Sequence, residues 1–415
     1  MRRFFVAARK AAGLLCSAGL LLLYFSAPMR GMRALPDVVY AETPGSAPLP
    51  GDTRLLRRAS EAAVETIAGG GQTLASVAGE SVAYRLFGFL PVRTVRVVRR
   101  DEVRLVPGGS AVGITIRTQG VLVVGLGTVD AAEGALSPGS AAGLRPGDVI
   151  LAADGRAIAN ADDLADACAA GEGGLRLAVD REGTMLELDV PLVRDQADGK
   201  ARIGLWVRDS TAGVGTLSFY DPETGWFAAL GHAVSDVDTQ SLLSVREGRI
   251  IESEIVSVRK GEQGCPGELI GVFSASGSAM GTILRNTEYG IFGKTEGAYE
   301  NALTGELPMG YGYEAHTGGA KLLATVSGEG VQAFDCEVLR VNAQQTASVK
   351  GMIIEVTDAA LLEKTGGIVQ GMSGCPVVQD GKLIGVVTHV FVNDPTRGYC
   401  IYAEWMRLLT AAGGG

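Results

Sequence analysis

One short segment near the C-terminus constrains this chain more than any other. Residues 371–376 read G-M-S-G-C-P, and residues 382–387, which follow closely, read K-L-I-G-V-V. Glycine adopts backbone angles that other residues avoid, so Gly371 and Gly374 predict a tight loop that presents Ser373. The apolar run after the loop has the length and composition of a buried strand. The segment therefore predicts a β-rich domain that holds a serine hydroxyl on a glycine-shaped loop.

A histidine lies upstream of this loop, directly after another apolar run. Residues 226–231 read W-F-A-A-L-G and precede His232. A serine hydroxyl becomes a useful nucleophile only when a base removes its proton, and histidine titrates near neutral pH. The chain has three histidines. We expect His232 to be the base, with His389 on the strand after the serine and His316 in a loop-like segment as the alternatives.

Two further elements of such a site are expected from the sequence. The N–H groups of Gly371 and Ser373 are expected to form an oxyanion hole. A carboxylate is expected to orient the imidazole. Asp236 and Asp238 lie close to His232 in the sequence, and Asp358 ends an apolar segment before the serine loop. Spacing alone does not choose among these three carboxylates.

The middle of the chain carries a second dense pattern. Residues 137–151 read S-P-G-S-A-A-G-L-R-P-G-D-V-I-L, which resembles a PDZ domain over about residues 104–193. Such domains bind an extended peptide at a sheet edge and capture its carboxylate with a backbone loop. We expect that loop at Ala111–Ile114, with Val112, Gly113 and Ile114 as peptide-binding residues, and a flanking helix near Ala161–Ala170. In the alternative, the module docks on its neighbour and binds no free peptide.

The N-terminus has the pattern of an export signal or membrane anchor. Basic residues at positions 2, 3, 9 and 10 precede an uncharged apolar run over 11–27. This order is typical of a segment that enters a membrane with its cationic flank inside. We expect a membrane helix within residues 1–30 and the rest of the chain outside the cytoplasm. A proline-containing linker over 30–52 and a short helix within 53–71 are expected to follow.

Composition excludes several classes of function. The net charge of −9 argues against nucleic-acid binding. Six cysteines occur without a C-x-x-C spacing, so we expect no zinc site, and no metal or organic cofactor is implied. The arginines between positions 93 and 104 alternate with valines, which favours a partly solvated strand over a phosphate-binding patch.

Three longer segments, residues 215–233, 366–374 and 387–396, resemble the stage IV sporulation protein B (SpoIVB) serine peptidase family. The resemblance implies a mainly β chain: a membrane segment (1–30), a linker and short β or helical lead-in (31–103), a PDZ domain (104–195) and a trypsin-like double β-barrel (196–415). It places the catalytic residues at His232, Asp358 and Ser373. The family usually has a second serine where this chain has Cys375, which raises the question of whether the thiol tunes the site, senses redox state or attacks substrate itself.

The same resemblance implies a role in sporulation signalling. Its members are membrane-tethered, extracytoplasmic serine endopeptidases of the space between the forespore membranes. They cleave themselves and a membrane-bound regulator of an intramembrane protease, which leads to sigma-factor activation. The alternative is a non-catalytic adaptor that binds partners through its PDZ groove. A periplasmic stress protease is disfavoured, because there the PDZ domain follows the protease domain.

Overall fold

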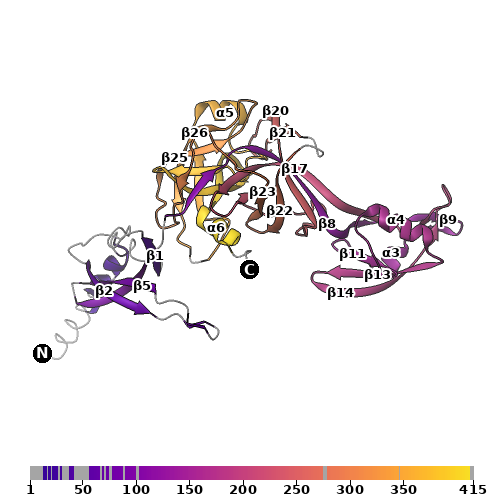
Figure 1. Ribbon diagram of the computed structural model, residues 1–415, viewed down its shortest axis with the longest axis horizontal. Coiled ribbons are helices and arrows are strands. Elements are labelled where there is room, and N and C mark those ends of the chain that lie inside the picture. The colour runs from indigo at the N-terminus through magenta and orange to yellow at the C-terminus, as the bar shows by residue number, and fades with distance from the viewer. Residues whose placement is uncertain are drawn as a thin grey trace.

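The computed structural model describes residues 102–273, 278–344 and 346–411, together with separate segments between residues 13 and 99. The N-terminal segments include a four-stranded sheet in the order β1-β6-β5-β2 and the small pair β3–β4 (Figure 1). These strands are β1 (Val38–Ala41), β2 (Leu56–Glu65), β3 (Ala68–Gly69), β4 (Gln72–Thr73), β5 (Val77–Leu86) and β6 (Leu90–Arg99).

The structure bears on two expectations for the N-terminal part of the chain. The short helix expected within residues 53–71 is wrong over residues 56–65, because β2 pairs antiparallel with β5 along its whole length. Partner hydrogen bonds of this kind readily override weak helix propensity. Among the residues that the structure describes, no helix has the length and apolar character needed to cross a bilayer. The first twelve residues of the expected membrane segment lie outside the described residues.

The first barrel contains six strands in the order β8-β19-β22-β23-β18-β17, and pairing of β17 with β8 closes it. Its core holds Val112, Ile114, Phe227, Ile250 and Ile283, all buried. The strands are β8 (Ala111–Leu126), β17 (Leu205–Asp221), β18 (Trp226–Ala229), β19 (Glu247–Glu252), β22 (Ala279–Thr287) and β23 (Gly290–Thr295). The short strands β7 (Arg104–Pro107) and β24 (Leu307–Pro308) extend the sheet beyond β17.

The second barrel is closed by six strands that follow one another in the chain, in the order β25-β26-β27-β30-β29-β28. They are β25 (Gly318–Ala324), β26 (Gln332–Val341), β27 (Met352–Val356), β28 (Pro376–Gln379), β29 (Lys382–Phe391) and β30 (Asp394–Tyr402). Helix α5 (Ala359–Thr365) precedes β28, and helix α6 (Ala403–Ala411) follows β30. An apolar cluster that includes Phe219, Phe292, Leu383 and Met406 joins α6 to both barrels. The mainly β, two-barrel fold is thus confirmed.

An α+β unit is inserted within the first barrel rather than placed before it. Strands β8 and β17 leave the barrel side by side and continue into this inserted unit, residues 118–209 (Figure 1). Its sheet continues from β8 through β11 and β13 to β14. Its elements are β9 (Val129–Ala131), β10 (Gly134–Leu136), α3 (Pro138–Ala141), β11 (Val149–Ala153), β12 (Arg156–Ala157), α4 (Ala161–Ala170), β13 (Gly174–Arg181), β14 (Thr184–Pro191), β15 (Val193–Arg194) and β16 (Ala201–Arg202).

The insertion changes the expected division of the chain. A serial arrangement with a module at 104–195 and a barrel domain from 196 assigns residues 104–117 to the module. In the structure β7 pairs with β17, and residues 112–117 of β8 pair with β19, so these strands belong to the barrel sheet. Strand β8 changes partners at the polar stretch 117–120, between its pairing with β19 and its pairing with β11. A polar stretch of this kind does not identify the strands that pair on either side of it.

Candidate active site

The loop that carries Ser373, residues 369–375, is held against the first barrel by backbone hydrogen bonds. The N–H of Thr216 in β17 donates to Ser373 O at 3.1 Å, and the N–H of Gly374 donates to Val387 O at 2.7 Å. Gly374 has a φ of +97°, and a Cβ at this position would lie 2.3 Å from Thr216 O. Only glycine fits both the angle and this close approach. The serine loop therefore lies where the two barrels meet.

His232 follows β18 and lies at the same junction. Its ring centroid is 5.2 Å from that of His389, which stands on β29 next to Thr388. A Cβ at Gly231 would lie 3.1 Å from the Thr388 side chain, so this strand and the histidine loop are in contact. The Ser373 Oγ donates to Thr388 O at 3.0 Å. The structure thus brings His232, Ser373 and His389 around the single residue Thr388.

The protonation of His232 is fixed by a backbone carbonyl. His232 Nδ1 lies 2.7 Å from Ala233 O. A carbonyl oxygen only accepts hydrogen bonds, so in the neutral ring Nδ1 carries the proton and Nε2 keeps its lone pair. Burial is the main cause that lowers the pKa of His232, and it outweighs the opposing effect of the Ala233 carbonyl. A neutral imidazole with a free Nε2 has the form that a general base requires.

The serine hydroxyl is not yet directed at that base. Ser373 Oγ donates to Thr388 O, and within the described chain it has no hydrogen bond to His232. Serine side chains change rotamer about χ1 without movement of the backbone, so the observed rotamer does not fix the acceptor in a substrate complex. Catalytic hydrogen bonds are often long or misaligned before substrate binds.

The two expected oxyanion donors have no acceptor among the described residues. The carbonyl of Gln370 accepts from Leu269 N at 2.8 Å, and the carbonyl of Met372 accepts from Cys375 N at 3.0 Å. In a trans peptide the N–H points opposite to the C=O. The N–H groups of Gly371 and Ser373 therefore have fixed directions and remain available to a developing oxyanion.

Asp358 is engaged in capping a helix. One carboxylate oxygen accepts from Ala360 N and Leu361 N, at 3.0 and 3.1 Å, at the start of α5, and the other accepts from Asp335 N at 3.2 Å. These backbone donors, Leu361 N first, lower the pKa of Asp358. The structure shows no bond between Asp358 and His232, so the orienting role expected for this carboxylate stays a prediction.

The two alternative carboxylates are engaged as well. Asp236 Oδ1 accepts from the backbone N–H groups of Asp238 and Thr239. Its other oxygen pairs with Arg208, which also contacts Asp238. In this structure the acceptor at Nδ1 of His232 is the Ala233 carbonyl, and none of the three aspartates takes that place.

The residues expected to bind a peptide carboxylate lie inside the first barrel. Val112, Gly113 and Ile114 pair with β17 on one side and with β19 on the other. Val112 and Ile114 are buried. Their N–H groups serve two neighbouring strands, so an added peptide strand has no free edge there, which corrects the expected carboxylate loop. Helix α4 does form over the expected residues, 161–170, but it lies against the chain's own β16 and β17.

The remaining candidates lie away from this chemistry. His316 pairs with Asp380 on the surface, at 2.7 Å, and this carboxylate raises its pKa. Cys375 is fully buried, and burial raises its thiol pKa to about 12, so in this conformation it is neither thiolate nor exposed to oxidants. The described part of the chain contains no group of three or more His, Cys, Asp or Glu side chains that could hold a metal ion.

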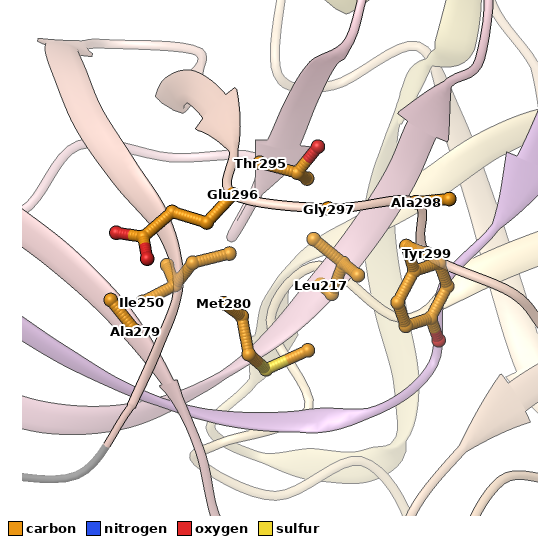
Figure 2. A pocket seen from close by; sticks show the side chains of 9 residues that line it. All are labelled: Leu217, Ile250, Ala279, Met280, Thr295, Glu296, Gly297, Ala298 and Tyr299. Carbon is orange, nitrogen blue, oxygen red and sulfur yellow. The ribbon is translucent and has the colours of Figure 1, made fainter.

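A cavity of about 320 Å³ opens at one mouth of the first barrel. Figure 2 shows the segment 295–299 passing over the side chains of Leu217, Ile250 and Met280. Tyr299 is anchored there by a 2.7 Å hydrogen bond between its hydroxyl and Ser110 Oγ. None of the candidate catalytic side chains lines this cavity, which therefore belongs to the barrel and not to the site.

Sequence reasoning missed two contributors to the site. Thr216 donates from its hydroxyl to Gly371 O at 2.7 Å, and the carbonyl of Ala233 fixes the histidine tautomer. A threonine in a strand and a backbone carbonyl leave no chemical signature in the sequence. The only available signal was that both lie in residues 215–233, one of the segments that carries the family resemblance.

A serine loop and a histidine that meet between two β-barrels define a serine peptidase of the two-barrel class. A family model described as SpoIVB peptidase S55 matches residues 199–407, slightly more than half of the chain, and a PDZ model matches residues 130–181. The chain belongs to the SpoIVB peptidase S55 family, and the inserted unit carries its PDZ domain.

The other comparisons are more distant. The crystal structure of the Rv3671c protease from M. tuberculosis, in its active form, matches with 15% sequence identity and a TM-score of 0.29. The match covers 49% of this chain and 75% of that chain. No curated protein matches this chain.

Proposed function

We propose that this chain is a membrane-tethered, extracytoplasmic serine endopeptidase in which Ser373 is the nucleophile and His232 is the base. The observation that carries the proposal is that His232 and Ser373 meet at strand β29, between the barrels. Ser373 Oγ donates to Thr388 O on this strand, and the ring of His232 lies beside the ring of His389, the next residue on it. Membership of a peptidase family supports the same reaction.

The geometry suggests how the reaction proceeds. Substrate binding displaces the serine hydroxyl from Thr388 O, and Nε2 of His232 takes its proton as Oγ attacks the scissile carbonyl. The N–H groups of Gly371 and Ser373 stabilise the negative oxygen of the tetrahedral intermediate. The imidazolium then gives the proton to the leaving amine. In the second half of the reaction, His232 takes a proton from water as the water attacks the acyl-enzyme, and it returns the proton to Ser373 Oγ as the acyl bond breaks.

We further propose the chain's place in sporulation signalling. In the space between the forespore membranes, the substrates are the chain itself and a membrane-bound regulator of an intramembrane protease, and cleavage of the regulator leads to sigma-factor activation. The PDZ domain supports protein or peptide substrates. Incubation of the full chain with membranes that carry the regulator tests this: cleavage of the regulator is expected, and an intact regulator beside an active enzyme contradicts it.

Substitution of the nucleophile tests the enzymatic proposal. Ser373→Ala is expected to abolish self-processing of the full chain, because losing a triad serine costs about 10⁴-fold or more in rate. Ser210→Ala is the matched control, since Ser210 is an exposed serine whose hydroxyl bonds, among the described residues, only to Asp209. Equal processing by Ser373→Ala and the unmodified chain would rule out Ser373 as the nucleophile and favour the adaptor alternative.

A further inference from the structure

Thr216 contacts the serine loop at two points from the first barrel. Its backbone N–H donates to Ser373 O at 3.1 Å, and its hydroxyl donates to Gly371 O at 2.7 Å. The residue is 2% exposed, and its hydroxyl also receives a weak bond from the Cys375 thiol at 3.6 Å. Thr216 of the first barrel is therefore hydrogen-bonded to both residues whose N–H groups are the expected oxyanion donors.

The hydroxyl bond fixes the peptide between the two oxyanion donors. Along the loop, the carbonyl of Gln370 is held by Leu269 N and the carbonyl of Met372 by Cys375 N. The middle peptide, between Gly371 and Met372, is held at its N–H by Val369 O at 3.0 Å. Its carbonyl is held by the Thr216 hydroxyl alone among the described residues. The middle peptide joins the two donor peptides through the Cα atoms of Gly371 and Met372, so a displacement of this peptide would change the separation of the two flanking N–H groups.

We propose that Thr216 is a positioning residue for the oxyanion hole: its hydroxyl locks the Gly371 carbonyl so that the N–H groups of Gly371 and Ser373 converge on the reacting oxygen. The inference deepens the proposed function and rests on it. Thr216 lies on β17, which runs without interruption from the inserted PDZ unit into the first barrel. The same strand therefore connects the PDZ domain to the oxyanion loop.

The test measures fluorophosphonate labelling of the full chain. Ser373 Oγ gives its proton to His232 as it attacks phosphorus, negative charge develops on the phosphoryl oxygen in the same hole, and fluoride leaves. Thr216→Val keeps the shape and the backbone bond but removes the hydroxyl. Misplacing a catalytic group by about 1 Å costs about 10²-fold, so the maximal labelling rate is expected to fall about 10- to 100-fold. The half-saturating probe concentration is expected to stay within about twofold. Thr216→Ser restores the hydroxyl and is expected to label within about threefold of the unmodified chain.

A matched control separates positioning from stability. Thr325→Val removes another buried hydroxyl that donates to a backbone carbonyl, Gly109 O at 2.9 Å, away from the serine loop. It is expected to destabilise the fold as much as Thr216→Val but to label at the normal rate. Thr216→Ala replaces Thr216→Val if the valine variant does not fold.

Three results would overturn the inference. Unchanged labelling of Thr216→Val contradicts it directly. An equal loss in Thr325→Val shows a general effect of destabilisation, and failure of Thr216→Ser to recover labelling shows that the hydroxyl is not what matters. These outcomes differ from failure of the proposed function, in which the unmodified chain itself does not label at Ser373.

Discussion

The two barrels of this peptidase are built in different ways. The second barrel closes from consecutive strands between residues 318 and 402, and it supplies the serine loop. The first barrel, which supplies His232, closes only when β8 and β17 pair across the inserted unit. Ala111 and Thr216, which lie before and after the inserted unit in the chain, are partners in this pairing. The nucleophile therefore depends on local chain order, whereas the base depends on correct closure around the PDZ domain.

This difference has a mechanical consequence. Strands β8 and β17 are shared between the PDZ unit and the first barrel, so the PDZ domain has no flexible linker to the catalytic domain. Strand β17 therefore connects the PDZ unit directly to the first barrel and to Thr216 beside the serine loop. The predictions below test how strongly the two barrels depend on each other.

The largest expected effect concerns the tie between the barrels. Arg407 on α6 lies 2.7 Å from Asp221 at the end of β17, with side chains 10% and 1% exposed. The contact is an ion pair without hydrogen-bond alignment. Arg407→Leu leaves the buried Asp221 charge without its partner, which costs about 3–5 kcal/mol. Urea unfolding followed by tryptophan fluorescence measures the loss.

The control for this prediction is a surface ion pair in the PDZ unit. Arg176 and Asp189 form a pair whose side chains are 64% and 78% exposed, so Arg176→Leu is expected to leave the unfolding midpoint almost unchanged. Equal effects of the two substitutions would mean that the Arg407 pair does not join the barrels.

A second prediction asks whether Asp358 caps a helix or serves the histidine. As an N-cap, Asp358→Ala costs about 1 kcal/mol of stability. Asp358→Asn keeps the capping oxygen but loses the bond from Asp335 N, so it is expected to cost less than Asp358→Ala and to preserve the labelling rate. As a triad member, Asp358→Asn lowers the rate about 10⁴-fold. Labelling kinetics together with urea unfolding distinguish the two roles, and the hydrogen bonds of Asp358 favour the first.

The smallest expected effect is a difference in pKa between two histidines, one from each barrel. Burial lowers the pKa of His232 in the first barrel, and Asp380 raises that of His316 in the second. His232 acts as a base only when neutral, that is, above its pKa. Because that pKa is lowered, the acidic limb of the labelling rate is expected below the ordinary histidine value of about 6.5.

Histidine titration by NMR measures the two pKa values separately and checks the assignment. His232 is expected to titrate at lower pH than His316. His389 also has a pKa lowered by burial, then by His232 and Lys350, so His389→Gln identifies its signal. A labelling limb that follows the higher-titrating histidine would argue against His232 as the base.

The sequence indicated the catalytic class of the site, but not the groups that hold the candidate catalytic residues in place. The structure places the serine loop and His232 at the junction of the barrels, and both could be named from the sequence because glycine spacing and a histidine after an apolar run are local patterns. The PDZ pattern was found for the same reason. The insertion was not predicted, because the sequence of a strand such as β8 does not identify the strands with which it pairs. The carboxylate loop at Val112–Ile114 failed for that reason, since pairing with β17 and β19 uses the N–H groups that the loop needed.

The supports of the site could not be predicted for a different reason. The Ala233 carbonyl and the Thr216 hydroxyl matter because of where they point in the fold. The sequence shows that these groups are present but not which partners they bond. Asp358 illustrates the reverse case, in which a chemically suitable residue is engaged by the N-terminus of α5.

The most direct test of the account is to map where a fluorophosphonate probe attaches to the full chain by mass spectrometry, with and without His232→Ala. The account predicts one adduct, on the peptide that contains Ser373, and its near-complete loss when the imidazole is removed. An adduct at another residue, or labelling of Ser373 at the same rate without His232, would contradict the claim that the two barrels bring this base to this nucleophile.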